Sequence, residues 1–96
     1  MDVHSSEVVD VPDEQHYVLH VDGRESGLAA YTMDGSTMTF THTETDPERQ
    51  GQGLGGALVQ GALDDARSRG FGVVPQCPFV AHWISEHPAY ADLVRS

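Results

Sequence analysis

The sequence predicts an α+β fold in which a mixed, mostly antiparallel sheet is accompanied by two main helices. The first half of the chain alternates apolar and polar residues and is divided by two Asp-Gly pairs, as expected for strands joined by tight hairpin turns. The second half places apolar residues at helical spacing on both sides of a short apolar run, as expected for a helix, a strand and a helix. The chain of 96 residues has room for one domain, residues 1–96.

The first half is expected to form a meander of four antiparallel strands. Pro12 stops the first strand, because proline lacks the amide hydrogen that a sheet needs. Asp22-Gly23 and Asp34-Gly35 are strong signals for hairpin turns, since these residue types tolerate a positive φ. The four strands are expected at residues 8–11, 16–21, 27–33 and 36–45.

The fourth strand has the clearest alternation in the chain. One of its faces consists of threonines at every second position from 37 to 45. The opposite face carries Met38, Phe40, His42 and Glu44. Because Met38 and Phe40 are apolar, this face is expected to point into the core, and His42 is then expected to point inward as well.

The second half is expected to fold as a helix, a strand and a second helix. Apolar residues at positions 54, 58, 59, 62, 63 and 66 mark one face of the first helix, and Gly70 is a fitting stop. The strand at residues 71–75 is expected to join the sheet by a parallel connection. Pro78 begins the second helix and Pro88 ends it, before a final helical turn at residues 89–94. The buried stripe of the second helix is expected to be Phe79, Val80, Trp83 and Ile84.

The charge balance excludes some partners. The chain has 15 acidic and 5 basic residues, with no lysine and a formal net charge of -10. Residues 1–48 hold 11 of the acids, and Arg24 is their one basic residue. A surface of this sign repels phosphate backbones, so nucleic-acid binding is not expected, whereas the acidic half favours a cationic substrate.

Other classes are excluded by what the motifs lack. The apolar runs are shorter than a membrane span requires. No secretory leader pattern is visible at the N-terminus, so a cytoplasmic location is expected. The six histidines and the single cysteine, Cys77, do not have the spacing of metal ligands, so no metal is expected.

A glycine-rich segment at residues 50–56 separates the two halves of the chain. Glycines between a strand and a helix let backbone N–H groups face a ligand, and the helix N-terminus adds a partial positive charge, so this segment is a candidate pyrophosphate site. Gly51, Gly53 and Gly56 also fit the dinucleotide spacing G-x-G-x-x-G, but no acidic residue follows the next strand to bind a ribose. No Gly-Lys-Ser/Thr sequence follows, which excludes the nucleotide P-loop.

Several motifs taken together resemble the GCN5-related N-acetyltransferase family, and within it the short YjdJ-type subgroup. Residues 50–55 match the family segment Q/R-x-x-G-x-G/A, and the resemblance extends over residues 16–94. Two positions depart from the family pattern. Gln50 stands where an arginine is common and cannot form a salt bridge to phosphate. Trp83 stands where a tyrosine is common and cannot donate a phenolic proton. The subgroup motifs are His42-Thr43-Glu44, Cys77-Pro78-Phe79 and His87-Pro88-x-Tyr90.

The resemblance implies a minimal acyl-CoA N-acyltransferase fold that uses acetyl-CoA as cosubstrate and transfers the acetyl group to an amine. The acceptor is then a small-molecule amine, a protein lysine or a protein N-terminus, and the protein is a monomer or a weak homodimer. The glycine-rich loop and the helix after it are implied to bind the CoA pyrophosphate through backbone N–H groups. The cofactor-binding residues are expected to be Thr43, Thr45, Arg49, Gln50, Gly51, Gln52, Gly53, Leu54, Gly55, Gly56, Pro78 and Phe79.

Three side chains are candidates for the chemistry. His42 titrates near neutral pH and is the candidate base, with Glu44 orienting it or acting itself. Cys77 lies just before a helix, and a helix N-terminus lowers the pKa of a thiol. Cys77 is therefore a candidate proton donor to the leaving thiolate, or a nucleophile that accepts the acetyl group. Two alternatives stay open: a CoA-binding or protein-interaction module without turnover, and a small acyl-CoA hydrolase that uses Cys77.

Overall fold

The computed structural model of the chain describes residues 6–46 and 53–95, and it confirms the predicted α+β fold. Five strands form one sheet in the order β1-β2-β3-β4-β5, with every pair antiparallel except β4 and β5. The strands are β1 (Ser6–Val11), β2 (His16–Val21), β3 (Arg24–Asp34), β4 (Thr37–Thr45) and β5 (Gly72–Pro75). The helical elements are α1 (Leu54–Ser68), α2 (Pro78–Ser85) and the short 3₁₀ helices η1 (Pro12–Glu14) and η3 (Pro88–Leu93).

The two hairpin turns lie where the Asp-Gly pairs predict them, with one small shift. Asp22 and Gly23 form the first loop and both have positive φ values, 53° and 81°. In the second hairpin Asp34 pairs with Thr37, so the loop consists of residues 35–36 and begins one residue later than expected. Each turn keeps its flanking strands in a register that buries the apolar residues on one face.

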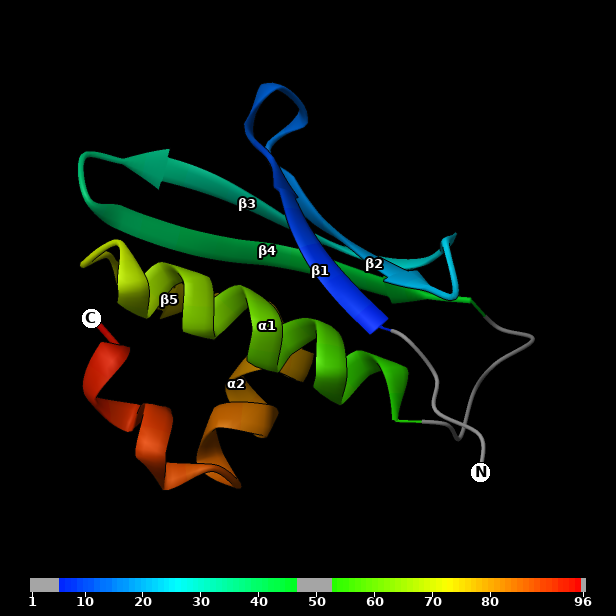
Figure 1. Cartoon of the computed structure of the whole chain (residues 1–96). Helices are drawn as coiled ribbons and strands as arrows, with labels where there is room; N and C mark the ends of the chain where they lie inside the picture. The colour runs from blue at the N-terminus through cyan, green and yellow to red at the C-terminus, as the bar shows by residue number, and fades with distance from the viewer. Residues whose placement is uncertain (1–5, 47–52, 96) are drawn as a thin grey trace.

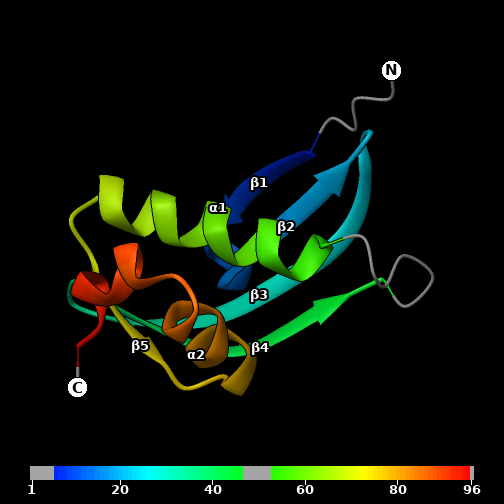
Figure 2. The same ribbon diagram turned by 90° about the horizontal axis from the view of Figure 1, so that it is seen from below.

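The helices α1, α2 and η3 lie together on one face of the sheet (Figure 1), and the view from below has them in front of the strands (Figure 2). The α1 stripe contributes five residues to the core, and Leu54, the first apolar residue of the predicted stripe, is half-buried. Of the predicted α2 stripe, Val80, Trp83 and Ile84 are buried, but Phe79 is 44% exposed. The largest fully buried side chains are Tyr17, Phe40, Leu19, Met38, Leu58, Leu63, Val59, Val73 and Val80.

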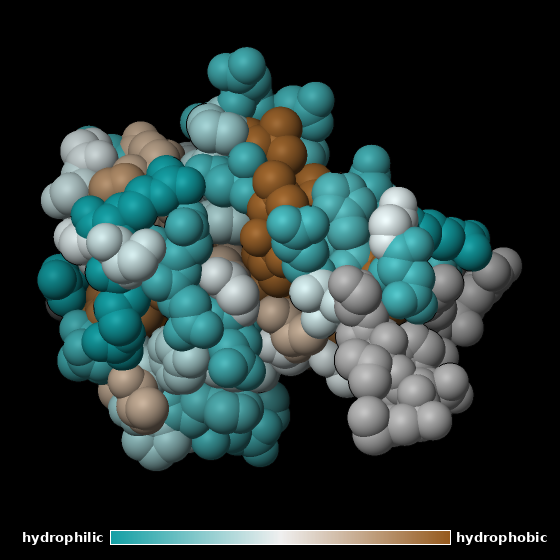
Figure 3. Space-filling model, viewed as in Figure 1, coloured by the Kyte–Doolittle hydropathy of each residue, from teal (hydrophilic) through white to brown (hydrophobic). Residues whose placement is uncertain are grey.

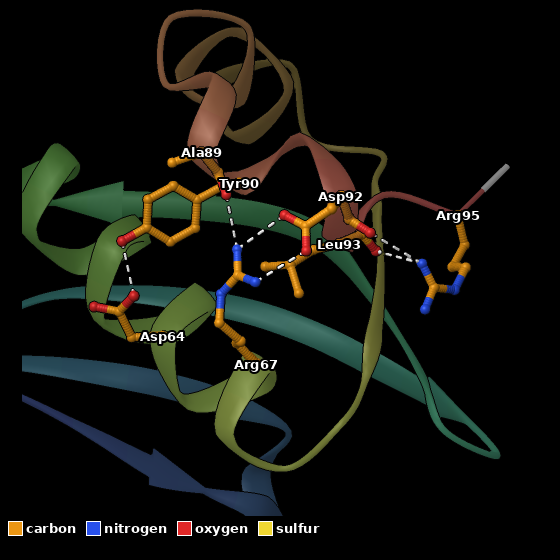
Figure 4. Close-up of polar contacts among 7 residues, drawn as sticks. All are labelled: Asp64, Arg67, Ala89, Tyr90, Asp92, Leu93 and Arg95. Carbon is orange, nitrogen blue, oxygen red and sulfur yellow. Dashed lines mark hydrogen bonds and ion pairs between the residues drawn. The ribbon is translucent and has the colours of Figure 1, made fainter.

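The C-terminal segment is tied to α1 and to β5. Arg67 of α1 donates two hydrogen bonds to the carboxylate of Asp92, at 2.9 and 3.0 Å, and one to the carbonyl of Ala89 (Figure 4). The Tyr90 hydroxyl donates to Asp64 at 2.7 Å. Beyond η3, the Arg95 N–H donates to the carbonyl of Val73 at 2.7 Å, so the end of the described chain pairs with β5. These contacts hold η3 beside the C-terminal half of α1.

Two features of β4 prepare the candidate site. In its pairing with β3, Ala30 lies opposite His42, and the next residue, Tyr31, lies opposite Phe40. Thr41 therefore has no partner in β3 and forms a β-bulge. Its pairing with β5 ends at Phe40 and Pro75, where β5 itself ends, while β4 continues to Thr45.

Candidate active site

The bulge at Thr41 reverses the face on which the end of β4 places its side chains. Phe40 is 1% exposed and faces the helices, and without a bulge His42 would face them too. Because Thr41 is extra, Thr43 and Thr45 share the helix face with Phe40 instead, and both are half-buried. The prediction that His42 points inward is therefore wrong.

His42 and Glu44 form a pair on the face of the sheet opposite the helices. Their side chains are 60% and 62% exposed, and His42 Nε2 lies 2.8 Å from a carboxylate oxygen of Glu44. The expected partnership between the two residues is present, but on the solvent side of the strand. In this position the carboxylate can orient the imidazole.

Cys77 lies on the helix side, just beyond the end of β5. Its N–H donates to the carbonyl of Phe40 at 2.9 Å, and its Sγ lies 3.3 Å from Oγ1 of Thr43. The residue is the N-cap of α2, with Pro78 in the first turn of the helix. The thiol is thus held between the end of β4 and the start of α2.

The surroundings of Cys77 favour the thiolate. Burial is the largest single influence on the pKa of the Cys77 thiol, and it raises that pKa. The hydrogen bond from the Thr43 hydroxyl and those from the backbone N–H groups of Val80, Phe79 and Thr43 together outweigh burial and lower the pKa of the thiol below its ordinary value. A thiolate held in this way is a better nucleophile at neutral pH and a poorer proton donor.

The N-terminus of α1 lies beside this group. Gly53 precedes the helix in the left-handed conformation, with φ 72°, and no side chain caps the helix. The first intrahelical bond of the turn runs from the Ala57 N–H to the Gly53 carbonyl. The N–H groups of residues 54–56 lie in the first turn of α1, where a helix offers them no carbonyl partner of its own, and such free helix ends can bind anions.

Two glycines of α1 allow α2 to approach closely. A Cβ on Gly55 would lie 2.6 Å from Cζ of Phe79, and a Cβ on Gly56 would lie 3.3 Å from Nε1 of Trp83. Some of the glycines in the predicted loop therefore make room for the chain's own aromatic rings. Phe79 joins the two parts of the site, since its ring lies against α1 and its backbone N–H points to Cys77.

The remaining predicted positions divide into two groups. Arg49, Gln50, Gly51 and Gln52 lie outside the described residues. Pro78 is exposed in the first turn of α2, where it fixes the direction of the helix. Sequence reasoning anticipated a helix N-terminus at Cys77, and the N–H groups of Phe79 and Val80 donate to the sulfur from it. It missed the donors from Thr43, because they reach the sulfur only when β4 and α2 pack together.

The described residues contain no group of three or more His, Cys, Asp or Glu side chains that could hold a metal ion. Within the same part of the chain, no helix is long and apolar enough to cross a membrane.

A mixed five-stranded sheet with one parallel pair and helices is the arrangement of the acyl-CoA N-acyltransferase fold, and solved structures of that fold are similar to this chain. A family model described as GCN5-related N-acetyl-transferase matches residues 16–93. The chain therefore belongs to the GCN5-related N-acetyltransferase family. No curated protein matches it.

Three solved structures illustrate the likeness of fold. The solution structure of a GCN5-like putative N-acetyltransferase from Staphylococcus aureus has 21% identity and a TM-score of 0.71, and the match covers 94% of this chain and 88% of that one. The ribosomal-protein-S18-alanine N-acetyltransferase of Escherichia coli has 18% identity and a TM-score of 0.64, over 90% and 76% of the two chains. The N-acetylglutamate synthase of Neisseria gonorrhoeae, complexed with coenzyme A and N-acetyl-glutamate, has 22% identity and a TM-score of 0.56, over 76% of this chain and 18% of that one.

Proposed function

We propose that this protein is an acetyl-CoA-dependent N-acetyltransferase of the short YjdJ-type subgroup that acetylates an amine, acting in the cytoplasm. The single observation that supports this most directly is the position of Cys77. Its sulfur lies beside Thr43, on the part of β4 that extends past the end of β5. The helix α1 covers the same side of the sheet (Figure 2). The family supplies the general activity, and the thiol supplies a reactive group beside the expected path of the thioester.

The binding of acetyl-CoA is proposed to begin at the N-terminus of α1. The backbone N–H groups of residues 54–56 provide a partial positive charge for the pyrophosphate. Arg49, Gln50, Gly51, Gln52 and Gly53 are proposed to bind the cofactor as well, on the family resemblance. Thr43, Thr45 and Phe79 line the route from this helix end toward Cys77. The residues present thus fit an extended ligand with an anionic middle and a thioester end.

The lowered pKa of Cys77 favours a nucleophilic role over an acidic one. In the proposed first step, the Cys77 thiolate attacks the thioester carbonyl, a bond from sulfur to the acetyl carbon forms, and the bond to the CoA sulfur breaks. The leaving CoA thiolate takes a proton from solvent. In the second step a neutral amine attacks the acetyl carbon of acetyl-cysteine and the bond to the Cys77 sulfur breaks. This restores the Cys77 thiolate, and the new amide nitrogen loses its extra proton to solvent.

His42 is proposed to deprotonate the incoming ammonium group from the opposite face of the sheet. Its pairing with Glu44 orients the ring and keeps the imidazole in reach of solvent, so that a proton can leave after each turnover. In a direct transfer the same base would serve, and Cys77 would have to be protonated to act as an acid. The hydrogen bonds that the Cys77 sulfur accepts weigh against that second role.

Isothermal calorimetry with acetyl-CoA tests the proposal first, and absence of binding at millimolar ligand would end it. Release of free CoA with a panel of amines then tests turnover in the wild type, Cys77→Ala and His42→Gln. The nucleophilic route predicts loss of turnover of about 1,000-fold in Cys77→Ala and of about 100-fold in His42→Gln. Glu86→Gln, which removes an exposed carboxylate on the helical side, is the matched control and is expected to act as wild type.

An acyl-CoA hydrolase is the second candidate, favoured by the same thiolate. Water instead of an amine would then attack the acetyl-cysteine. Mass spectrometry of the protein after incubation with acetyl-CoA alone separates the two functions. Acetylated Cys77 that persists until an amine is added supports the transferase, and steady CoA release without any amine supports the hydrolase.

A further inference from the structure

The face of the sheet opposite the helices carries an apolar row that the proposed chemistry does not use. Val9, Val18, Leu28 and Glu44 are directly paired across β1, β2, β3 and β4. Tyr17 and Leu19 on either side of Val18 face the helices and are buried, so the row faces the other way. Val18 is only 5% exposed, and Val9 and Leu28 are half-buried. In the described residues, the helices lie on the opposite side (Figure 2).

The apolar surface begins at the free edge of the sheet. In the view of Figure 1, a hydrophobic stripe follows β1 on the molecular surface (Figure 3). The row on one side of Val18 consists of Val11, His16, Ala30 and His42. The paired rows of residues therefore lead from β1 across the sheet to the imidazole of the proposed base. Three strand spacings separate the two ends, which is about 14 Å, the reach of four or five extended residues.

Carboxylates border this apolar surface. The paired row on the other side of Val18 consists of Glu7, His20 and Glu25. The central row ends at Glu44 in β4. All three glutamates are exposed. In these three rows no Lys or Arg accompanies them. An anionic rim around an apolar centre fits a ligand that is both cationic and apolar.

The charge selects among possible occupants. A second copy of the chain carries the same net charge of -10 and the same acidic rim, so two such faces repel. A free polyamine would meet the carboxylates but would make no use of the half-buried apolar side chains of Val9 and Leu28. A basic segment of a protein, with apolar side chains between its lysines, satisfies both parts of the surface.

We infer that this open sheet face docks an extended, lysine-rich and apolar peptide segment that carries the acceptor amine. The inference rests on the proposed function, and it names the class of acceptor. A peptide lying across β1 to β4 places one lysine beside His42 and Glu44, on the part of β4 that extends past the end of β5. The rest of the segment packs on the valine and leucine row, with its other lysines beside Glu7 and Glu25.

Fluorescence anisotropy tests docking without acetyl-CoA. The probe is a short fluorescein-labelled peptide of alternating lysine and leucine, compared with versions that have serine for every leucine or glutamate for every lysine. The first peptide is expected to bind about ten-fold more tightly than either of the others. Equal binding of the serine version would overturn the inference, because it would show attraction by charge alone, as with a polyamine.

Substitutions locate the binding face. Glu7→Gln/Glu25→Gln is expected to weaken peptide binding about five-fold, and Leu28→Thr by a similar factor. The control Asp64→Asn/Glu86→Gln removes the same charge from the helical side and is expected to change affinity less than two-fold. Docking on this face is contradicted if both double variants lose peptide affinity equally. It is also contradicted if Leu28→Thr keeps its affinity while circular dichroism shows that the protein is folded.

Two further measurements separate this inference from the proposed function. Calorimetry with acetyl-CoA on Glu7→Gln/Glu25→Gln and on Leu28→Thr is expected to match wild type, since these three residues lie in β1 and β3, away from α1 and Cys77. If acetyl-CoA fails to bind while the peptide still docks, the transferase proposal fails and the docking face stands. Sedimentation at the concentrations used is expected to show no self-association through β1, and a dimer abolished by Leu28→Thr would assign the face to a second copy instead.

Discussion

Thr43 and Cys77 meet side chain to side chain, with 3.3 Å between Oγ1 and Sγ, although they are 34 residues apart in the chain. The contact depends on two events in the sheet. The bulge at Thr41 turns Thr43 toward the helices, and β5 ends at Pro75, which leaves Cys77 beside β4 at the start of α2. The hydroxyl donates to the sulfur when Cys77 is a thiolate, and this contributes to the lowered pKa of the thiol.

Removing the Thr43 hydroxyl is expected to raise the pKa of Cys77. Thr43→Val keeps the shape of the side chain but loses the donor, so the thiolate fraction near neutral pH falls. The rate of alkylation by iodoacetamide is expected to drop about three- to ten-fold at neutral pH and to recover in alkaline solution, where either protein is fully ionised. The measurement is the pH profile of alkylation, with Thr43→Ser as the matched control. An unchanged profile in Thr43→Val would show that the backbone donors alone set the pKa of the thiol.

A methyl group at Gly55 is expected to impair the anion site while leaving the fold intact. In Gly55→Ala the added Cβ would lie 2.6 Å from Cζ of Phe79, the outer end of an exposed side chain that can swing away. Alanine also favours the helix by roughly 1 kcal/mol over glycine, so the free energy of unfolding is expected to change little. The displaced ring and the methyl group beside the N–H groups are expected to weaken acetyl-CoA binding about ten-fold.

The double variant Gly55→Ala/Phe79→Ala distinguishes the causes of that loss. If the displaced ring is responsible, the double variant binds acetyl-CoA no more weakly than Phe79→Ala alone, because the clash is absent. A purely additive loss would assign the effect to the methyl group and not to Phe79. Calorimetry of the four proteins completes the thermodynamic cycle.

The bulge predicts opposite consequences for two residues that are two positions apart. Phe40 is 1% exposed, and Phe40→Leu is expected to lower the free energy of unfolding by about 1 kcal/mol or more. The His42 side chain is 60% exposed, and His42→Ala is expected to change that free energy by less than about 0.5 kcal/mol. Urea unfolding measures both. A large loss in His42→Ala would indicate that β4 is regular and that the imidazole is buried.

The same bulge marks the limit of what the sequence could predict in this strand. The order of the main strands and helices was predicted correctly from patterns among neighbouring residues. These patterns are the alternation of apolar and polar residues in the strands, the Asp-Gly turns and the helical spacing of apolar residues in α1. Thr41 looks like the other threonines of the strand, and its extra position is set by how Ala30 and Tyr31 pair with β4. The faces of residues 42–45 were therefore assigned the wrong way round.

The sequence could indicate single residues of the candidate site, but it could not predict which of them contact one another. Cys77 before Pro78 indicated a thiol at a helix start, and the structure confirms that position. The approach of Thr43 and the packing of Phe79 on Gly55 arise when strands and helices assemble, and no local pattern encodes them. Sequence reasoning also gave the glycines one purpose, the approach of a ligand, whereas Gly55 and Gly56 admit rings of α2 as well.

Two buried tyrosines make the fold sensitive to alkaline pH. Burial, the largest cause, and hydrogen bonds to Asp65 and Asp10 raise the pKa values of Tyr17 and Tyr31 above the ordinary value near 10. The Tyr17 hydroxyl donates to Asp65 at 2.7 Å and the Tyr31 hydroxyl to Asp10 at 2.6 Å, while Arg69 bridges the two carboxylates at 2.7 and 2.8 Å. The folded protein therefore keeps two phenolic protons that the unfolded chain releases above pH 10 or so.

The stabilisation from these protons is fully present below the unfolded pKa and is lost as pH rises from about 10 toward the folded pKa values, at up to about 1.4 kcal/mol per pH unit for each tyrosine. Urea unfolding between about pH 9 and 11 is expected to show this decline in the wild type and a flatter profile in Tyr17→Phe/Tyr31→Phe. Tyr90→Phe, which loses a hydrogen bond on the exposed side of α1, is expected to keep most of the dependence. If the double variant declines as steeply as the wild type, the alkaline loss of stability comes from groups outside this network, since phenylalanine has no proton to release.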